Sequence, residues 1–204
     1  YNCSMKSSTH KPAYYVINGI TIYRVIAAPV LLLILLFKQY DLFKWLLAFS
    51  FFTDFIDGFL ARKFRVTSIF GTRLDSIGDD LTIVAAIVGL IVIKPLFLKQ
   101  HMVLIGLLLA LHLTQIIYSF IRYGKITSFH TYFAKTAAIL QGVFLILVFF
   151  LPEPVLPLFY AAVILTGLEL IEEIIMVSLL PNWEANVKGL YWVLKKKKQE
   201  KISH

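Results

Sequence analysis

Cysteine is nearly absent from this sequence of 204 residues, which holds only Cys3. A single cysteine excludes an internal disulfide and a metal cage built from cysteines. Charge is also scarce, because Asp, Glu, Lys and Arg make up 16% of the residues, whereas an ordinary soluble domain has about 25%. Apolar residues reach 59%. This composition argues against a soluble globular enzyme, a disordered chain and a fibre, and nucleic acid is a poor partner for so apolar a chain despite its net charge of +8.

Long apolar runs are what the sequence has in abundance. Six of them follow one another at 16–37, 43–61, 76–93, 102–121, 131–151 and 155–180. Each is near the roughly 20 residues that one membrane crossing needs, and each is too long and too uniformly apolar for a barrel strand. Because backbone groups in lipid must be bonded within their own segment, helices are expected. The prediction is an all-α integral membrane protein, with a polar leader at 1–13, six transmembrane helices within 14–180 and a basic tail at 181–204. The first run lacks a small-residue cleavage pattern and is interpreted as a retained helix.

Positive charge is unevenly distributed between the two predicted membrane faces. With six crossings both termini lie on one side, and that side collects sixteen of the twenty Lys and Arg residues. The other side has Lys38, Lys44, Lys94 and Lys99. This bias places both termini in the cytosol. If the protein is bacterial, it is expected in the inner membrane. One interpretation of the lysine run at 195–198 is that it contacts anionic lipid headgroups. The other, equally favoured, is that it lies in solvent and only sets the orientation of the protein in the membrane.

Acidic residues are few, and five of the twelve lie between Asp54 and Asp80. Asp54 and Asp57 are three residues apart, and Asp75 and Asp79 are four apart, so each pair shares one helical face. The segment that joins the two helices is predicted to be cytosolic, which brings both pairs near one membrane surface. Four converging carboxylates repel one another unless cations lie between them. Hard oxygen ligands suit Mg²⁺ or Mn²⁺, and a pair of such ions suits phosphoryl transfer.

The residues around these carboxylates fit a nucleotide. Gly58 and Gly71 let the backbone approach a ligand closely, Ala61 leaves space on the same face, and Arg62 can hold a phosphate. The structural alternative is that the carboxylates cap helix ends or pair with neighbouring arginines. Ionisable groups at membrane depth favour the functional interpretation.

The complete pattern resembles the signature of the CDP-alcohol phosphotransferases. It reads Asp54-x2-Asp57-Gly58-x2-Ala61-Arg62-x8-Gly71-x3-Asp75-x3-Asp79. Members of that family transfer the substituted phosphate of a CDP-alcohol to a hydroxyl and release CMP. The resemblance, which extends over essentially the whole chain, implies that Asp54, Asp57 and Asp75 are metal ligands. It also implies that Asp79 shares a metal or acts as general base, that the CDP group is cradled by Gly58, Ala61, Arg62 and Gly71, and that the protein is a homodimer.

The first predicted helix carries a polar stripe made of Asn18, Thr21 and Arg24, each three residues apart. The pattern resembles the first helix of the phosphatidylglycerophosphate and cardiolipin synthase branches of the family. One interpretation is that Asn18 and Thr21 face the CDP group. The other is that Asn18 caps the helix and Arg24 extends to the membrane interface.

The acceptor alcohol is suggested by cations near the predicted cytosolic ends of the helices. Arg73, Arg122 and Lys135 would suit a phosphate on the acceptor, which favours glycerol 3-phosphate and then inositol phosphate. Ser76 and Asp80 depart from the phosphatidylglycerophosphate branch and are closer to inositol-type and serine-type relatives. Neutral acceptors, namely inositol, serine and phosphatidylglycerol, therefore stay open.

Three glutamates, Glu169, Glu172 and Glu173, lie within the last apolar run, and a structural role is favoured because no motif covers them. The predicted function is transfer of the phosphatidyl group of CDP-diacylglycerol to a polar acceptor at the cytosolic face of the membrane. A small cation transporter is the rival, but transport predicts acidic residues spread through the bilayer depth rather than gathered at one surface. An inactive relative is disfavoured by the retention of all four motif aspartates.

Overall fold

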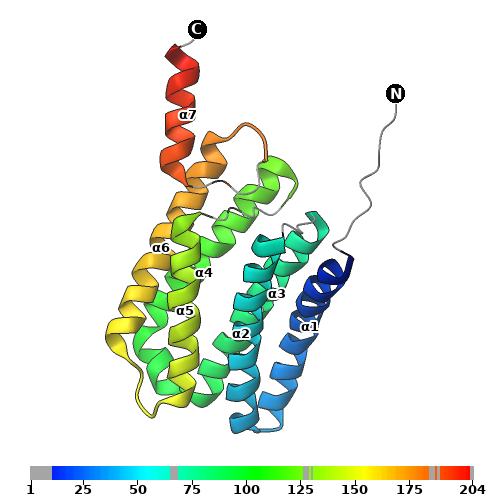
Figure 1. Ribbon diagram of the computed structural model, residues 1–204. Coiled ribbons are helices and arrows are strands. Elements are labelled where there is room, and N and C mark those ends of the chain that lie inside the picture. Colours follow the sequence, from blue (N-terminus) through cyan, green and yellow to red (C-terminus); the bar gives the residue numbers. More distant parts are fainter. Residues whose placement is uncertain are drawn as a thin grey trace. The chain divides into compact units, whose positions relative to one another are not determined.

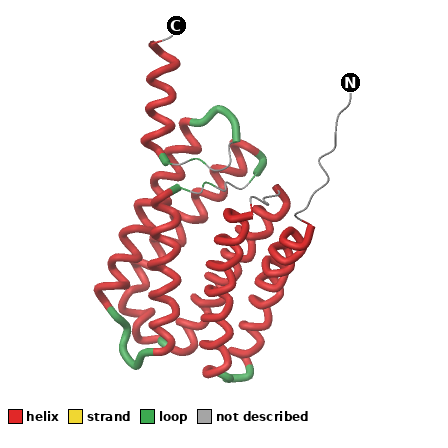
Figure 2. Tube along the Cα trace, viewed as in Figure 1, coloured by secondary structure: helices red, strands yellow, loops and turns green. Residues whose placement is uncertain are grey.

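The computed structural model describes residues 11–64, 69–125, 129, 131–183, 187 and 189–202. Within them the chain is helical and has no strand (Figure 2), as the sequence predicts. The helices are α1 (Lys11–Leu36), α2 (Tyr40–Phe64), α3 (Ile69–Ile93), α4 (Pro95–Tyr123), α5 (Tyr132–Phe150), α6 (Leu156–Leu179) and α7 (Leu190–Ile202), labelled in Figure 1. Among the described residues, α4 and α5 have the length and hydropathy to cross a membrane. The helices form two compact units, residues 1–92 and 93–204, which are described separately.

In the first unit α1 and α2 form an antiparallel pair joined by a tight turn (Figure 1). Lys38 adopts a left-handed conformation there, with φ of 56°, and its N–H bonds to the carbonyl of Leu35. Ala27 and Ala28 are buried on α1, and small residues of this kind let membrane helices pack closely. Phe43 of α2 is buried in the same unit. These buried side chains form part of the core of the first unit.

The second unit is built around α6, which packs against α4, α5 and α7. Local residues fix the helix ends: Pro95 begins α4, Gly124 ends it in the left-handed conformation with φ of 63°, and the Thr131 hydroxyl accepts the N–H of Ala134 at the start of α5. Two of the three glutamates in the last apolar run have structural contacts. Glu173 accepts a hydrogen bond of 2.7 Å from the Gln115 amide, and this buried pair joins α4 to α6.

Helix α7 lies within the tail that the sequence analysis treats simply as basic and polar. Its first turn packs on the end of α6, where Val193 joins a buried cluster with Met176 and Val177. The Glu172 carboxylate accepts a hydrogen bond of 2.8 Å from the backbone N–H of Leu190, the first residue of α7. An anion at a helix N-terminus is favourable because the first N–H groups have no partner within the helix. A contact with a residue distant in sequence thus stabilises the start of α7, whose own sequence is rich in lysine.

Gly189→Ala is expected to loosen α7 from α6. Gly189 has a φ of +146°, and an added Cβ would lie 3.1 Å from the Glu172 carboxylate. A side chain in this glycine-only region costs about 1–3 kcal/mol. The backbone amides of the first turn of α7 should therefore exchange with deuterium faster, as mass spectrometry can measure. Gly106→Ala in α4 is the matched control, since its Cβ would enter open space. Unchanged exchange in Gly189→Ala would contradict this account of the junction.

Candidate active site

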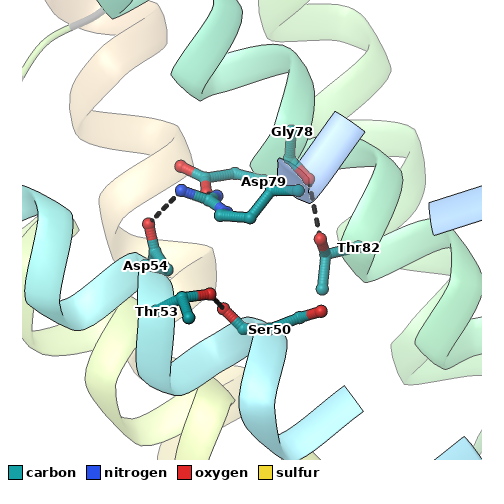
Figure 3. Close-up of polar contacts among 7 residues, drawn as sticks. Ser50, Thr53, Asp54, Gly78, Asp79 and Thr82 are labelled. Atoms are coloured by element: carbon teal, nitrogen blue, oxygen red, sulfur yellow. Dashed lines mark hydrogen bonds and ion pairs between the residues drawn. The ribbon is translucent and has the colours of Figure 1, made fainter. Parts of the chain in front are cut away.

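Two of the motif aspartates meet at one buried arginine in the first unit. Asp54 projects from α2 and Asp79 from α3 toward the same space (Figure 3). The guanidinium of Arg24, on α1, pairs with both: Nη1 lies 2.6 Å from Asp54 Oδ1, and Nη2 pairs with Asp79 Oδ1. Three helices therefore each supply one charged group to this cluster.

Arg24 and the two carboxylates differ in their access to the surroundings. The Arg24 side chain is 1% exposed, whereas those of Asp54 and Asp79 are 38% and 46% exposed. One guanidinium between two carboxylates leaves a net charge of −1 on the three groups. The cluster therefore combines a buried cation with partly accessible carboxylate oxygens that retain a net attraction for a further cation.

The hydroxyl groups of Thr53 and Thr82, which lie near this cluster, form hydrogen bonds within their own helices. Thr53 donates to the carbonyl of Ser50 at 2.9 Å, and Thr82 donates to the carbonyl of Gly78 at 2.8 Å (Figure 3). Such bonds to the preceding turn satisfy a hydroxyl locally. Gly78 also faces α1, because an added Cβ there would lie 3.5 Å from Cβ of Arg24. Gly78 of α3 therefore lies next to the Arg24 side chain.

The other predicted site residues of the first unit lie on the same three helices. Asp57, Gly58, Ala61 and Arg62 are in α2, Gly71, Arg73 and Asp75 are in α3, and Asn18 and Thr21 are in α1. Both aspartate pairs fall on uninterrupted helix, so each pair has the one-face spacing that the sequence predicts. The side chains of these nine residues lie outside the described part of the structure. The assignment of their roles stays a prediction.

Arg24 was not among the candidate site residues, and one interpretation of it is wrong. Its side chain does not extend to the membrane interface but is buried on two motif aspartates. The spacing of Asn18, Thr21 and Arg24 showed that α1 has a polar face. It could not show which helices that face contacts, because this depends on the packing of α1 against α2 and α3.

The two candidate acceptor cations in the second unit have exposed side chains with local contacts. Arg122 donates a hydrogen bond of 3.2 Å to the carbonyl of Leu180, and its guanidinium carbon lies 5.9 Å from the centre of the Tyr123 ring. The Lys135 ammonium lies 5.5 Å from the ring centre of Tyr132. Arg122 thus satisfies a carbonyl at the end of α6, and the residue is exposed.

The candidate metal ligands that the structure describes in the first unit are carboxylate oxygens. Asp54 and Asp79 each offer the hard oxygen atoms that Mg²⁺ and Mn²⁺ prefer, and both lie within reach of a single cationic group. In the described part of the chain, no group of three or more His, Cys, Asp and Glu side chains is close enough to hold a metal ion. Asp57 and Asp75, the other two predicted ligands, fall outside that description.

Several curated proteins give partial matches, and three of them share the name CDP-diacylglycerol–glycerol-3-phosphate 3-phosphatidyltransferase. The protein of Pseudomonas fluorescens is 34% identical over 77 residues, which are 36% of this chain and 40% of that protein. The protein of Rickettsia bellii is 37% identical over 78 residues, with coverage of 36% and 42%. The protein of Haemophilus influenzae is 37% identical over 73 residues, with coverage of 34% and 39%. The chain spans about two fifths of the length of these relatives. No solved structure gives a significant match.

A family-wide comparison covers much more of the sequence. The profile described as CDP-alcohol phosphatidyltransferase matches residues 14–178, which include helices α2 to α5 whole and nearly all of α1 and α6. The matched region contains the complete aspartate motif and Arg24. The chain belongs to the CDP-alcohol phosphatidyltransferase family.

Proposed function

We propose that this protein transfers the phosphatidyl group of CDP-diacylglycerol to the hydroxyl of a polar acceptor, glycerol 3-phosphate, and releases CMP. The observation that carries the proposal is the meeting of Asp54 and Asp79 at Arg24, within a chain that belongs to the family. The names of three partial relatives support glycerol 3-phosphate as the acceptor.

The aspartates are assigned to metal binding. Family members generally use a divalent metal ion. The partly exposed oxygens of Asp54 and Asp79 and the net negative charge of their cluster fit such an ion. We assign Asp54, Asp57 and Asp75 as ligands, with Asp79 shared, of two Mg²⁺ or Mn²⁺ ions. When bound, such ions neutralise the charge that develops on the pyrophosphate as CMP leaves.

The acceptor hydroxyl must lose its proton as its oxygen attacks the phosphorus next to the lipid alkoxide. A carboxylate within hydrogen-bond reach of that hydroxyl can take the proton. We assign this role to Asp79, since it comes last in the motif and its side chain is the more exposed of the two described carboxylates. The new phosphodiester bond then replaces the bond to CMP.

The CDP group is assigned to the small and polar residues that flank the aspartates. Glycine lets a backbone approach a phosphate or base closely, and an arginine can hold a phosphate through two parallel hydrogen bonds. The proposed contacts are Asn18, Thr21, Gly58, Ala61, Arg62 and Gly71.

The proposed membrane setting follows from length and charge. Helices α1 to α6 would each cross the membrane, within a catalytic domain at 14–180, and the excess of Lys and Arg would place both termini and the active site at the cytosolic face. The leader at 1–13 and the tail at 181–204 would then be cytosolic. A homodimer is proposed from the family resemblance.

The direct test is CMP release from CDP-diacylglycerol in mixed micelles with Mg²⁺ and a panel of acceptors. Glycerol 3-phosphate should support turnover, whereas inositol phosphate, inositol, serine and phosphatidylglycerol should not. CMP release with another acceptor alone would keep the reaction class and change the acceptor. The absence of release with every acceptor would refute the enzyme proposal.

Arg122→Ala is expected to raise the KM for glycerol 3-phosphate about tenfold or more, because a charge-assisted contact to phosphate is worth roughly 1.5–3 kcal/mol. Lys135→Ala should act in the same direction, with Arg73 the third candidate. The KM for CDP-diacylglycerol should change little. Lys99→Ala, on the predicted opposite side of the membrane, is the control. If both Arg122→Ala and Lys135→Ala leave the acceptor KM unchanged, a neutral acceptor becomes the better proposal.

A further inference from the structure

The buried position of Arg24 needs an explanation beyond folding. Its side chain is 1% exposed, and its guanidinium pairs with carboxylates from two other helices. Replacing a buried ion pair by apolar residues of similar volume is often neutral or stabilising. A buried charge is thus a poor device for stability alone, and here both partners belong to the family's aspartate motif.

The shape of the guanidinium matters as much as its charge. Nη1 reaches Asp54 and Nη2 reaches Asp79, so two separate donors of one rigid, planar group contact two carboxylates. This contact sets the spacing between one carboxylate oxygen of α2 and one of α3. A lysine ammonium has the same charge but no planar fork, and cannot fix two acceptors in the same geometry.

The side chain of Arg24 lies alongside Gly78 of α3. At Gly78 of α3 an added Cβ would lie 3.5 Å from Cβ and 3.8 Å from Cζ of Arg24, and 3.7 Å from a methyl group of Val25. The side chain of Arg24 therefore runs directly along α3 beside the residue that precedes Asp79. The two ion pairs restrict the conformation of this side chain.

We propose that Arg24 is a positioning residue, whose guanidinium holds the carboxylates of Asp54 and Asp79 at a fixed spacing and offsets their repulsion. This inference rests on the proposed function, because the carboxylates that it orients are those assigned to the reaction. Arg24 contacts no reacting atom in this proposal. It acts through the two aspartates, and α1 thereby sets the relative placement of reactive groups on α2 and α3.

Arg24→Lys separates geometry from charge. We expect kcat for CMP release to fall about 10²-fold, the usual cost of a displacement near 1 Å, while the KM for CDP-diacylglycerol stays within about threefold. The melting temperature in detergent should change by only about 2–4 °C, since the buried charge remains paired. Lys44→Gln, which removes a cation paired with Asp41 elsewhere on α2, is the matched control and should keep full activity. A normal kcat in Arg24→Lys, or a loss of kcat that only follows a loss of folded protein, would overturn the proposal.

A stability measurement tests, without any assay of activity, whether Arg24 links the two aspartates. Arg24→Met leaves both carboxylates without their cation, whereas Asp79→Asn leaves Arg24 paired with Asp54 alone, and the double variant removes both groups of the Arg24–Asp79 pair. Because contacting residues couple, the double variant should melt roughly 2–8 °C above the value expected from adding the two single losses. Strictly additive decreases in melting temperature would refute this link. If the wild type releases no CMP, the proposed function fails, whereas this thermal cycle still decides whether Arg24 links the two aspartates.

Discussion

Asp57→Asn is expected to lower the rate of CMP release by about 10³-fold or more, because a catalytic metal contributes several kcal/mol of charge stabilisation in the transition state. The change preserves the size of the side chain and removes one negative charge from the proposed metal site. Added Mg²⁺ should restore activity only in part. Turnover should be measured over a range of Mg²⁺ concentrations in detergent-solubilised protein.

Asp41→Asn is the matched control for Asp57→Asn. Asp41 lies in the first turn of α2, on the same helix as Asp57, and pairs with Lys44. Its side chain is 90% exposed, so the pair is worth little to stability. The control variant should keep its activity and its Mg²⁺ dependence. Near-normal turnover in Asp57→Asn would rule out the metal-ligand assignment.

Asp79→Asn is expected to reduce turnover by about 10²–10⁴-fold through loss of the general base, with CDP-diacylglycerol binding largely preserved. Asp54 remains to pair with Arg24, so the protein should still fold. Turnover should be measured by CMP release and binding by displacement of labelled CDP-diacylglycerol. These two measurements separate proton abstraction from ligand binding.

The comparison of Asp79→Asn with Asp57→Asn decides the role of Asp79. A base affects chemistry more than binding, whereas a metal ligand affects both because the metal contacts the pyrophosphate. An equal loss of CDP-diacylglycerol binding in the two variants would make Asp79 a further metal ligand. The base would then have to be sought among other groups.

The sequence by itself determined the helices of the six apolar runs and the principal candidate residues. Long apolar runs leave helix as the conformation that satisfies the backbone in lipid, and the structure is helical at each of the six predicted runs. Helical spacing then places Asp54 with Asp57, and Asp75 with Asp79, on common faces. Both results depend on local chain geometry, which the order of residues expresses directly.

Only the tertiary structure decided which groups meet. The polar stripe on α1 did not reveal that Arg24 bridges Asp54 and Asp79, because helical periodicity fixes a face but not the helix that packs on it. The lysine-rich tail did not reveal α7, because its start depends on the distant Glu172 carboxylate and on the packing of Val193 against α6. Contacts between residues far apart in sequence depend on the packing of whole helices, and that packing brings the motif carboxylates of Asp54 and Asp79 together.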